Sequence, residues 1–144
     1  MRSKATHERI NQGLIINCDV LGRDCDDSII DDLHTGSHNV RASQTAGMTY
    51  LFKGKMIAYA YRDSPNGTDW TDTYQVWLTP GGNYIAYHNR EKETGPDIAK
   101  ACVIYATGTE NDHAEAVMNA FGWTHVARDM VKKQLGWKLH VEIL

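Results

Sequence analysis

Apolar and polar residues alternate with a period of two through the middle of the chain, which is typical of strands that bury one face. Two aromatic and aliphatic runs, residues 48–53 and 55–62, are separated by Gly54, and this pattern fits either a tight hairpin or one long bulged strand. Further strands are expected over residues 73–79, 83–89 and 100–107. The pattern therefore predicts an antiparallel meander.

A Thr-Pro-Gly-Gly sequence joins two of these expected strands. Proline at position 80 fixes φ at the first central position of a turn, and Gly81 tolerates a positive φ at the second. A type II turn is the prediction.

The last third of the chain changes to helical spacing. Asp112, with Glu115 three residues later, resembles a capping box, and Gly122 marks the end of this first helix. A second helix is expected to begin near Thr124 and to end before Gly136. The residues expected to face the core from the two helices are Ala114, Val117, Met118, Phe121, Val126, Ala127, Met130, Val131 and Leu135.

Residues 137–144 alternate again, with Trp137, Leu139, Val141 and Ile143 on one side, so they predict a closing strand. The whole pattern indicates an α+β fold. We expect an antiparallel sheet of about five to six strands, two C-terminal helices packed on one face, and the C-terminal strand completing the sheet.

The first third of the chain is more polar than the rest. Residues 1–45 predict an N-terminal extension with a strand near residues 14–20 and a short acidic helix near residues 26–33. Asp26 is placed to cap that helix, and Ile29, Ile30 and Leu33 form its apolar face. Residues 46–144 are then the α+β core domain.

Length and charge limit the classes of function. A chain of 144 residues corresponds to one domain, and a formal net charge of −3 argues against a general binder of nucleic acid. Neither a membrane span nor a signal sequence is expected, and the three cysteines, Cys18, Cys25 and Cys102, are too few for a secreted disulfide scaffold. These features favour a cytoplasmic protein with reduced thiols, although the spacing leaves a Cys18–Cys25 disulfide open.

Catalytic and metal motifs are weak. The acidic stretch at Asp24–Asp32 lacks the glycine and glutamate of a calcium loop, and His34 and His38 flank a glycine that opposes a continuous helix. His113 with Glu115 and His125 offers acid–base chemistry only if the three residues meet across a cleft. We therefore expect no cofactor, no metal site and no catalytic residues, and the sequence favours a binding protein over an enzyme.

Aromatic residues are concentrated in the predicted sheet, and cationic and amide side chains stand near the strand ends. Such a surface suits stacking of a base with its phosphates on arginine or lysine, and equally suits a protein interface. Ordinary cross-strand packing is the alternative explanation. If the helices cover only one face, the candidate ligand-binding residues on the other are Tyr59, Tyr61, Arg62, Trp77, Tyr87, His88, Asn89 and Arg90.

Three segments of the chain resemble the EXLDI proteins, an uncharacterised actinobacterial family named for a C-terminal Glu-x-Leu-Asp-Ile motif. They are Phe52-Lys-Gly-Lys-Met-Ile-Ala58, Tyr74-Gln-Val-Trp-Leu-Thr-Pro-Gly-Gly-Asn-Tyr-Ile-Ala-Tyr87 and Val141-Glu-Ile-Leu144. The resemblance implies no activity and assigns no functional residue.

The leading hypothesis is a non-enzymatic, homo-oligomeric binding protein that recognises a small ligand such as a nucleotide, or a partner protein. An accessory or inhibitor protein of a phage or mobile element fits this description. A small hydrolase using a metal or the His and Glu residues above is one alternative, and a structural or assembly domain is another.

Overall fold

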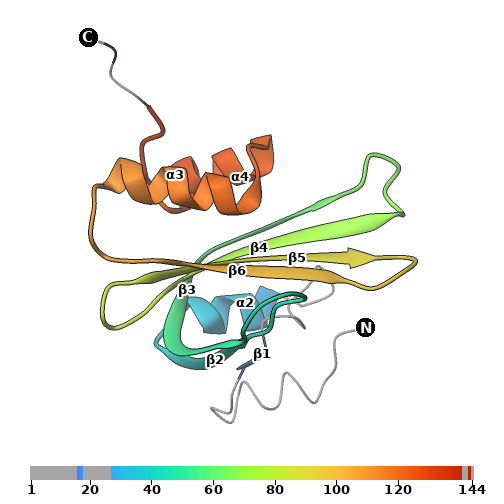
Figure 1. Cartoon of the computed structure of the whole chain (residues 1–144), viewed down its shortest axis with the longest axis horizontal. Coiled ribbons are helices and arrows are strands. Elements are labelled where there is room, and N and C mark those ends of the chain that lie inside the picture. Colours follow the sequence, from blue (N-terminus) through green and yellow to red (C-terminus); the bar gives the residue numbers. More distant parts are fainter. Residues whose placement is uncertain (1–15, 18–26, 141–142, 144) are drawn as a thin grey trace.

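The computed structural model describes residues 16–17, 27–140 and 143. Its strands form one sheet in sequence order, β1 to β6, and helices lie on both faces of that sheet (Figure 1). β1 (Ile16–Asn17) pairs in parallel with β2 (His38–Ala42), and the pairs from β2 to β6 are antiparallel. The predicted α+β class with an antiparallel sheet is confirmed.

β3 (Tyr50–Asp63) is the longest strand and joins the two halves of the sheet. Its first part pairs with β2 and its second part with β4 (Trp70–Leu78), with a register shift between Met56 and Ala58. Of the two alternatives at Gly54, the structure therefore has the long bulged strand. A Cβ atom on Gly54 would lie 3.1 Å from the carbonyl oxygen of Leu78, so the close approach of the two backbones favours glycine.

β4 continues through a turn into β5 (Tyr84–Lys92), which pairs with β6 (Ile98–Ile104). In the turn, the amide of Gly82 donates to the carbonyl of Thr79 at 2.9 Å. The positive φ falls on Gly82, at 85°, and not on Gly81. The predicted type II turn is therefore wrong, because a left-handed residue placed after the turn matches the twist of the two strands better.

Two helical segments cover one face of the sheet. α3 (Glu110–Phe121) begins with a capping box between Thr109 and Asp112, three residues before the predicted position, and ends at Gly122 as predicted. Thr124 caps α4 (His125–Asp129), which continues as the π-helical turn η2 (Met130–Gln134). Within the described ranges, no helix is long and apolar enough to cross a membrane.

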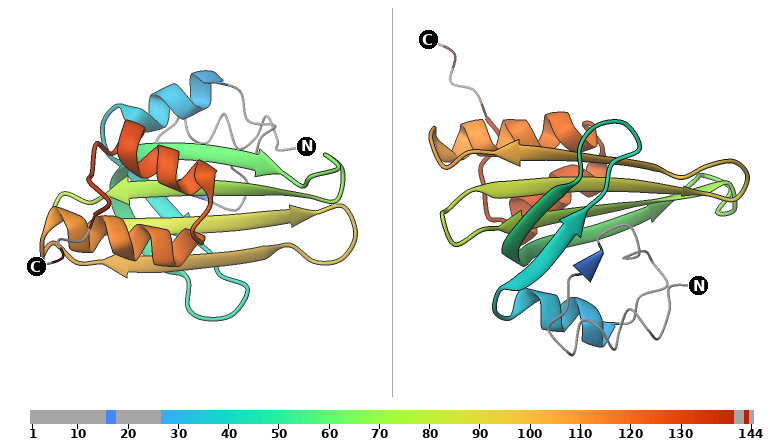
Figure 2. Two further views of the ribbon diagram at one scale, coloured as in Figure 1. Left: turned by 90° about the horizontal axis from the view of Figure 1, so that it is seen from above. Right: turned by 60° about the horizontal axis from the view of Figure 1, so that its bottom comes forward.

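The opposite face is also covered. α2 (Asp27–His34) and β2 lie against it, as the right-hand view in Figure 2 shows. Leu33 of α2 is fully buried in one hydrophobic cluster with Val40 of β2 and Trp77 of β4. The expectation of an open sheet face is therefore wrong. Because residues 27–45 supply part of this core, packing does not divide the chain at residue 46.

The predicted closing strand is absent from residues 137–140. This segment instead passes the start of α3, where the amide of Lys138 donates to Glu110 Oε1 at 3.2 Å. The outer edge of β6 is occupied elsewhere along its length, since Ala99 and Ala101 bond to the loop that holds Thr45 and Gln44. A further strand has little free edge to join there. Val141, Glu142 and Leu144 lie outside the described residues.

Candidate functional site

A row of charged side chains crosses the helix-covered face of the sheet. The strand register places Arg62 of β3, Asp72 of β4 and Arg90 of β5 opposite one another, and Tyr74, His88 and Lys100 form the next row. Seen from above, the connection between α3 and α4 stops partway along the strands, and the β3–β4 and β5–β6 hairpins project beyond it (Figure 2). The row is consequently only partly covered.

Asp72 is the centre of this row, and its side chain is fully buried. Arg90 donates to it twice, from Nε to Oδ1 at 2.7 Å and from Nη2 to Oδ2 at 2.9 Å. Arg62 Nε and the Tyr74 hydroxyl each donate to Oδ2 at 3.2 Å. His88 Nε2 lies 3.0 Å from Oδ1, without the geometry of a hydrogen bond. Asp72 thus fixes both arginines.

Burial alone would raise the pKa of Asp72. The hydrogen bonds from Arg90, the nearby His88 and the positive charges outweigh burial, so the pKa of Asp72 lies well below its usual range. Burial and the charge of Asp72 raise the pKa of Tyr74, which keeps that phenol a donor, and the hydrogen bond to Asp72 raises the pKa of Arg90. One carboxylate therefore lies between two guanidinium groups.

Trp70 stacks with the same arginines. The guanidinium carbons of Arg90 and Arg62 lie 4.0 and 5.1 Å from its ring centroid, within the range of a cation–π interaction. Arg62 is bonded only through Nε, to Asp72 and to the Tyr74 hydroxyl. Within the described part of the chain, both terminal amino groups of Arg62 are left without a hydrogen bond.

A hollow lies on each side of Asp72. The Arg62 hollow has a volume of about 450 Å³ and is lined by Arg62, Trp123, Thr124, His125 and Arg128. The Arg90 hollow has a volume of about 230 Å³ and is lined by His88, Arg90, Ile98 and Lys100. Among these lining residues there is no carboxylate.

The balance of charge in this region is positive. Arg62, Arg90, Lys100 and Arg128 are opposed by Asp72 alone among the ion pairs of the described residues. Cationic side chains thus line both hollows, although the whole chain has a formal net charge of −3. Fixed guanidinium groups with free donors are well suited to binding phosphate or carboxylate.

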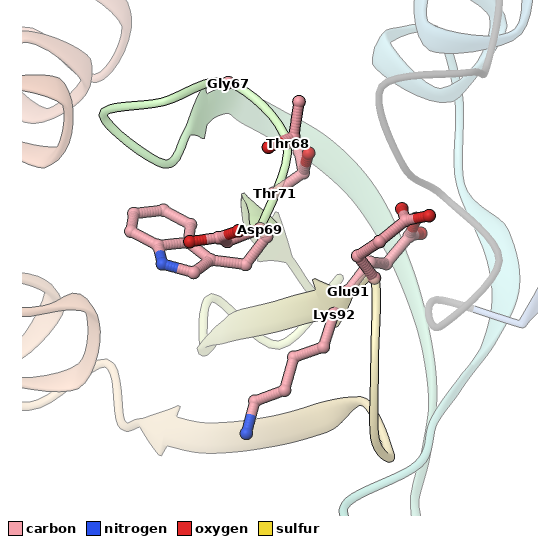
Figure 3. Close-up of a pocket in the computed structure, with 8 residues that line it drawn as sticks. Gly67, Thr68, Asp69, Thr71, Glu91 and Lys92 are labelled. Carbon is pink, nitrogen blue, oxygen red and sulfur yellow. The ribbon is translucent and has the colours of Figure 1, made fainter.

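A third hollow, of about 420 Å³, lies at the ends of the hairpins and is polar and acidic. Figure 3 shows Lys92 extending away from Thr68 and Thr71, with Asp69 and Glu91 at other sides of the space. Across the described ranges, no three or more His, Cys, Asp or Glu side chains are grouped so that they could hold a metal ion. Its carboxylates, Asp69, Glu91 and Glu93, outnumber its one lysine, Lys92.

The structure brings together only three of the eight predicted ligand-binding residues, namely Arg62, His88 and Arg90. The other five lie on the opposite face: Tyr59, Tyr61, Trp77, Tyr87 and Asn89. The Trp77 and Tyr87 side chains are fully buried beneath α2 and β2, so neither ring presents a surface to a ligand.

Sequence reasoning missed Asp72, Trp70, Lys100 and Arg128 as site residues. Period-two alternation places residues 70, 72 and 74 on one face of β4, and this signal was available. Whether this face of β4 would hold the site depended on where α3 and α4 pack. Arg128 enters the site from α4, and nothing in the sequence indicates that approach.

The two predicted metal candidates, His34 and His38, contact backbone carbonyl groups instead. His34 Nδ1 is hydrogen-bonded to the Met56 carbonyl, and His38 Nε2 lies 2.9 Å from the Asp32 carbonyl. These contacts hold the end of α2 against β3. They account for both imidazoles as structural groups.

The acid–base candidates are not assembled into one site. His113 packs between Tyr84 and Trp137, with ring centroids 5.3 and 5.9 Å away. Glu115 lines a hollow beside Leu139 and His140, whereas His125 lines the Arg62 hollow. Each of the three side chains therefore has different surroundings.

Cys102 is a half-buried free thiol in β6. Cys18 and Cys25 lie outside the described residues, so their pairing stays open.

Comparisons with models of protein families, with curated proteins and with solved structures find no match. The resemblance to the EXLDI proteins therefore remains a prediction.

Proposed function

We propose that this chain is a binding protein for a small phosphorylated ligand, such as a nucleotide, and that a phosphoryl group binds in the Arg62 hollow. The support comes from the Asp72-centred row of charges and the two hollows beside it. Catalysis is not part of the proposal.

Arg62 is the observation that carries this proposal. Its guanidinium is held by Asp72, by the Tyr74 hydroxyl and by the face of Trp70, yet its terminal amino groups make no hydrogen bond to any residue that the structure describes. A donor group that is already fixed loses little conformational freedom when an anion binds. Arg128 lines the same hollow and adds a second positive charge.

Trp123 supplies an aromatic wall. Its side chain is 56% exposed, and its indole nitrogen donates to Asn119 Oδ1 at 3.0 Å, which fixes the ring. A nucleobase can stack on such a ring without hydrogen bonds that recognise the edges of the base. The hollow thus combines cationic donors with a stacking surface.

The hollow favours binding over hydrolysis. The Thr124 hydroxyl accepts the amide of Ala127 as the cap of α4, so it already has a structural role. His125 is the one titratable base among the residues that line the hollow. A nucleophile paired with a base and an orienting group, which hydrolysis by covalent catalysis requires, is missing from that set.

Calorimetric titration with adenosine 5′-monophosphate tests the proposal. Arg62→Gln removes the free donors and should weaken binding at least 10-fold, as expected for loss of a charge-assisted contact of about 1.5 kcal/mol or more. Arg128→Gln should also weaken binding, and it leaves the contacts of Asp72 intact. Arg41→Gln, an exposed change on β2, is the matched control and should bind as wild type does.

Thermal unfolding of each variant separates lost binding from lost folding. The proposal is overturned if wild-type protein does not bind the nucleotide, or if both Arg62→Gln and Arg128→Gln bind it as tightly as wild type.

We further propose that this protein is cytoplasmic and homo-oligomeric, in keeping with an accessory or inhibitor protein that sequesters its ligand. The free Cys102 thiol supports a reducing compartment. Met48 and Leu51 are 77% and 67% exposed and support a contact surface between copies. Sedimentation velocity tests the second point, and a monomer at all concentrations would exclude it.

A further inference from the structure

The Arg90 hollow has the features of a second anion site. Arg90 is held by two hydrogen bonds to Asp72, and its guanidinium carbon lies 4.0 Å from the Trp70 ring centroid. Asp72 and the Trp70 ring therefore both hold this guanidinium in place. Lys100 is exposed, and no ion pair neutralises it among the described residues. His88 completes the polar lining, and Ile98 closes one side.

The two hollows are related through one carboxylate. Arg62 and Arg90 stand on β3 and β5, on either side of β4, so their backbones are about 10 Å apart at the usual strand spacing. Asp72 lies between them and bonds both. Fixed positive charges consequently flank a single buried negative charge.

Resting on the proposed function, we infer that the ligand carries two separate phosphoryl groups, one for each hollow. A nucleoside 3′,5′-bisphosphate is the class of ligand that fits. Its phosphoryl groups lie on opposite sides of one ribose, whereas the phosphates of a diphosphate are directly joined. The nucleoside then lies across the sheet between Arg62 and Arg90.

The lining of the Arg90 hollow favours a phosphoryl group over a carboxylate. Its polar lining consists of a guanidinium, an ammonium and an imidazole, a set that suits three phosphoryl oxygens and about two negative charges. A carboxylate has two oxygens and one charge, and it would leave part of this set unpaired. The acidic third hollow near Asp69 and Glu91 repels either anion and bounds the site at the hairpin ends.

Calorimetric titration with adenosine 5′-monophosphate and adenosine 3′,5′-bisphosphate, on the full chain, tests the inference. Wild type should bind the bisphosphate at least 10-fold more tightly than the monophosphate. Lys100→Gln should remove most of that preference, because it should lower the bisphosphate affinity by a much larger factor than the monophosphate affinity. Lys53→Gln, an exposed lysine on the first part of β3, is the matched control and should preserve both affinities.

Lys100 makes no contact with Asp72 in the structure, so this variant should fold as wild type does. If wild type binds both ligands equally, or if Lys100→Gln weakens both by the same factor, the second site is refuted while the Arg62 site stands. If neither ligand binds to wild type, the proposed function itself fails, and the second site fails with it.

Discussion

Replacing Asp72 by asparagine removes the negative charge that holds Arg62 and Arg90 on the sheet. The amide keeps one acceptor oxygen and presents an NH₂ group where the second oxygen stood. That NH₂ group then faces donors of the arginines and of Tyr74. The change is nearly isosteric, so its effect reports charge and hydrogen bonding rather than packing.

The expected loss of stability follows from burial. Removing one partner of a buried ion pair costs about 3–5 kcal/mol, because the remaining charges are left uncompensated. Arg62 and Arg90 are 34% and 31% exposed, so water can hydrate part of each guanidinium. We therefore expect a loss of about 3 kcal/mol, which lowers Tm by roughly 10 °C for a domain of this size.

Urea unfolding at pH 7 measures this loss. Asp129→Asn is the matched control, since that carboxylate is 61% exposed and lies 3.9 Å from Lys133. It should change stability by less than about 0.5 kcal/mol, as exposed ion pairs usually do. If Asp72→Asn costs no more than the control, the row of charges does not hold the arginines.

The effect should also depend on pH. The pKa of Asp72 is lowered by folding, so its contribution to stability is fully present above the unfolded pKa of about 3.9 and is lost as the pH falls through the folded value. The difference between wild type and Asp72→Asn should therefore be smaller at pH 3 than at pH 5 by about 1 kcal/mol. A difference that widens on acidification would contradict the assigned direction of the pKa shift.

Two further changes test the fold. Leu33→Ala should cost about 3 kcal/mol in urea unfolding because Leu33 is fully buried, whereas Leu51→Ala, 67% exposed, should cost less than about 0.5 kcal/mol; equal effects would show that α2 does not belong to the core. Gly82→Ala should cost about 1 kcal/mol because its φ is 85°, while Gly81→Ala, which has no positive φ and no close neighbour, should be neutral or slightly stabilising; the reverse order would exclude the observed turn.

Local sequence patterns predicted most of the secondary structure correctly. The alternation over residues 48–62 and the helical spacing before Gly122 depend on residues close together in the chain, so they can be interpreted without knowing the fold. Two of the errors were also local in origin. Thr109 has the same capping chemistry as Asp112, and Gly81 and Gly82 both tolerate a positive φ, so composition alone did not choose between them.

The candidate site was only partly predictable. Arg62, His88 and Arg90 were selected because cationic residues stand near strand ends, and they do come together. Trp77 and Tyr87 were selected with them because aromatic residues are equally common in cores and on binding surfaces. Their burial depends on α2 and β2, which cover a face expected to be open.

The sequence by itself determined where strands and helices form, because period and capping act within a few residues along the chain. Only the tertiary structure decided which face of β4 would lie under α3 and α4, and therefore that Asp72, with no distinguishing motif around it, would be buried between two arginines. Pairing of β3, β4 and β5 joins residues 62, 72 and 90 at distances in sequence that local patterns do not encode. Burial then makes one carboxylate the residue that fixes both cations.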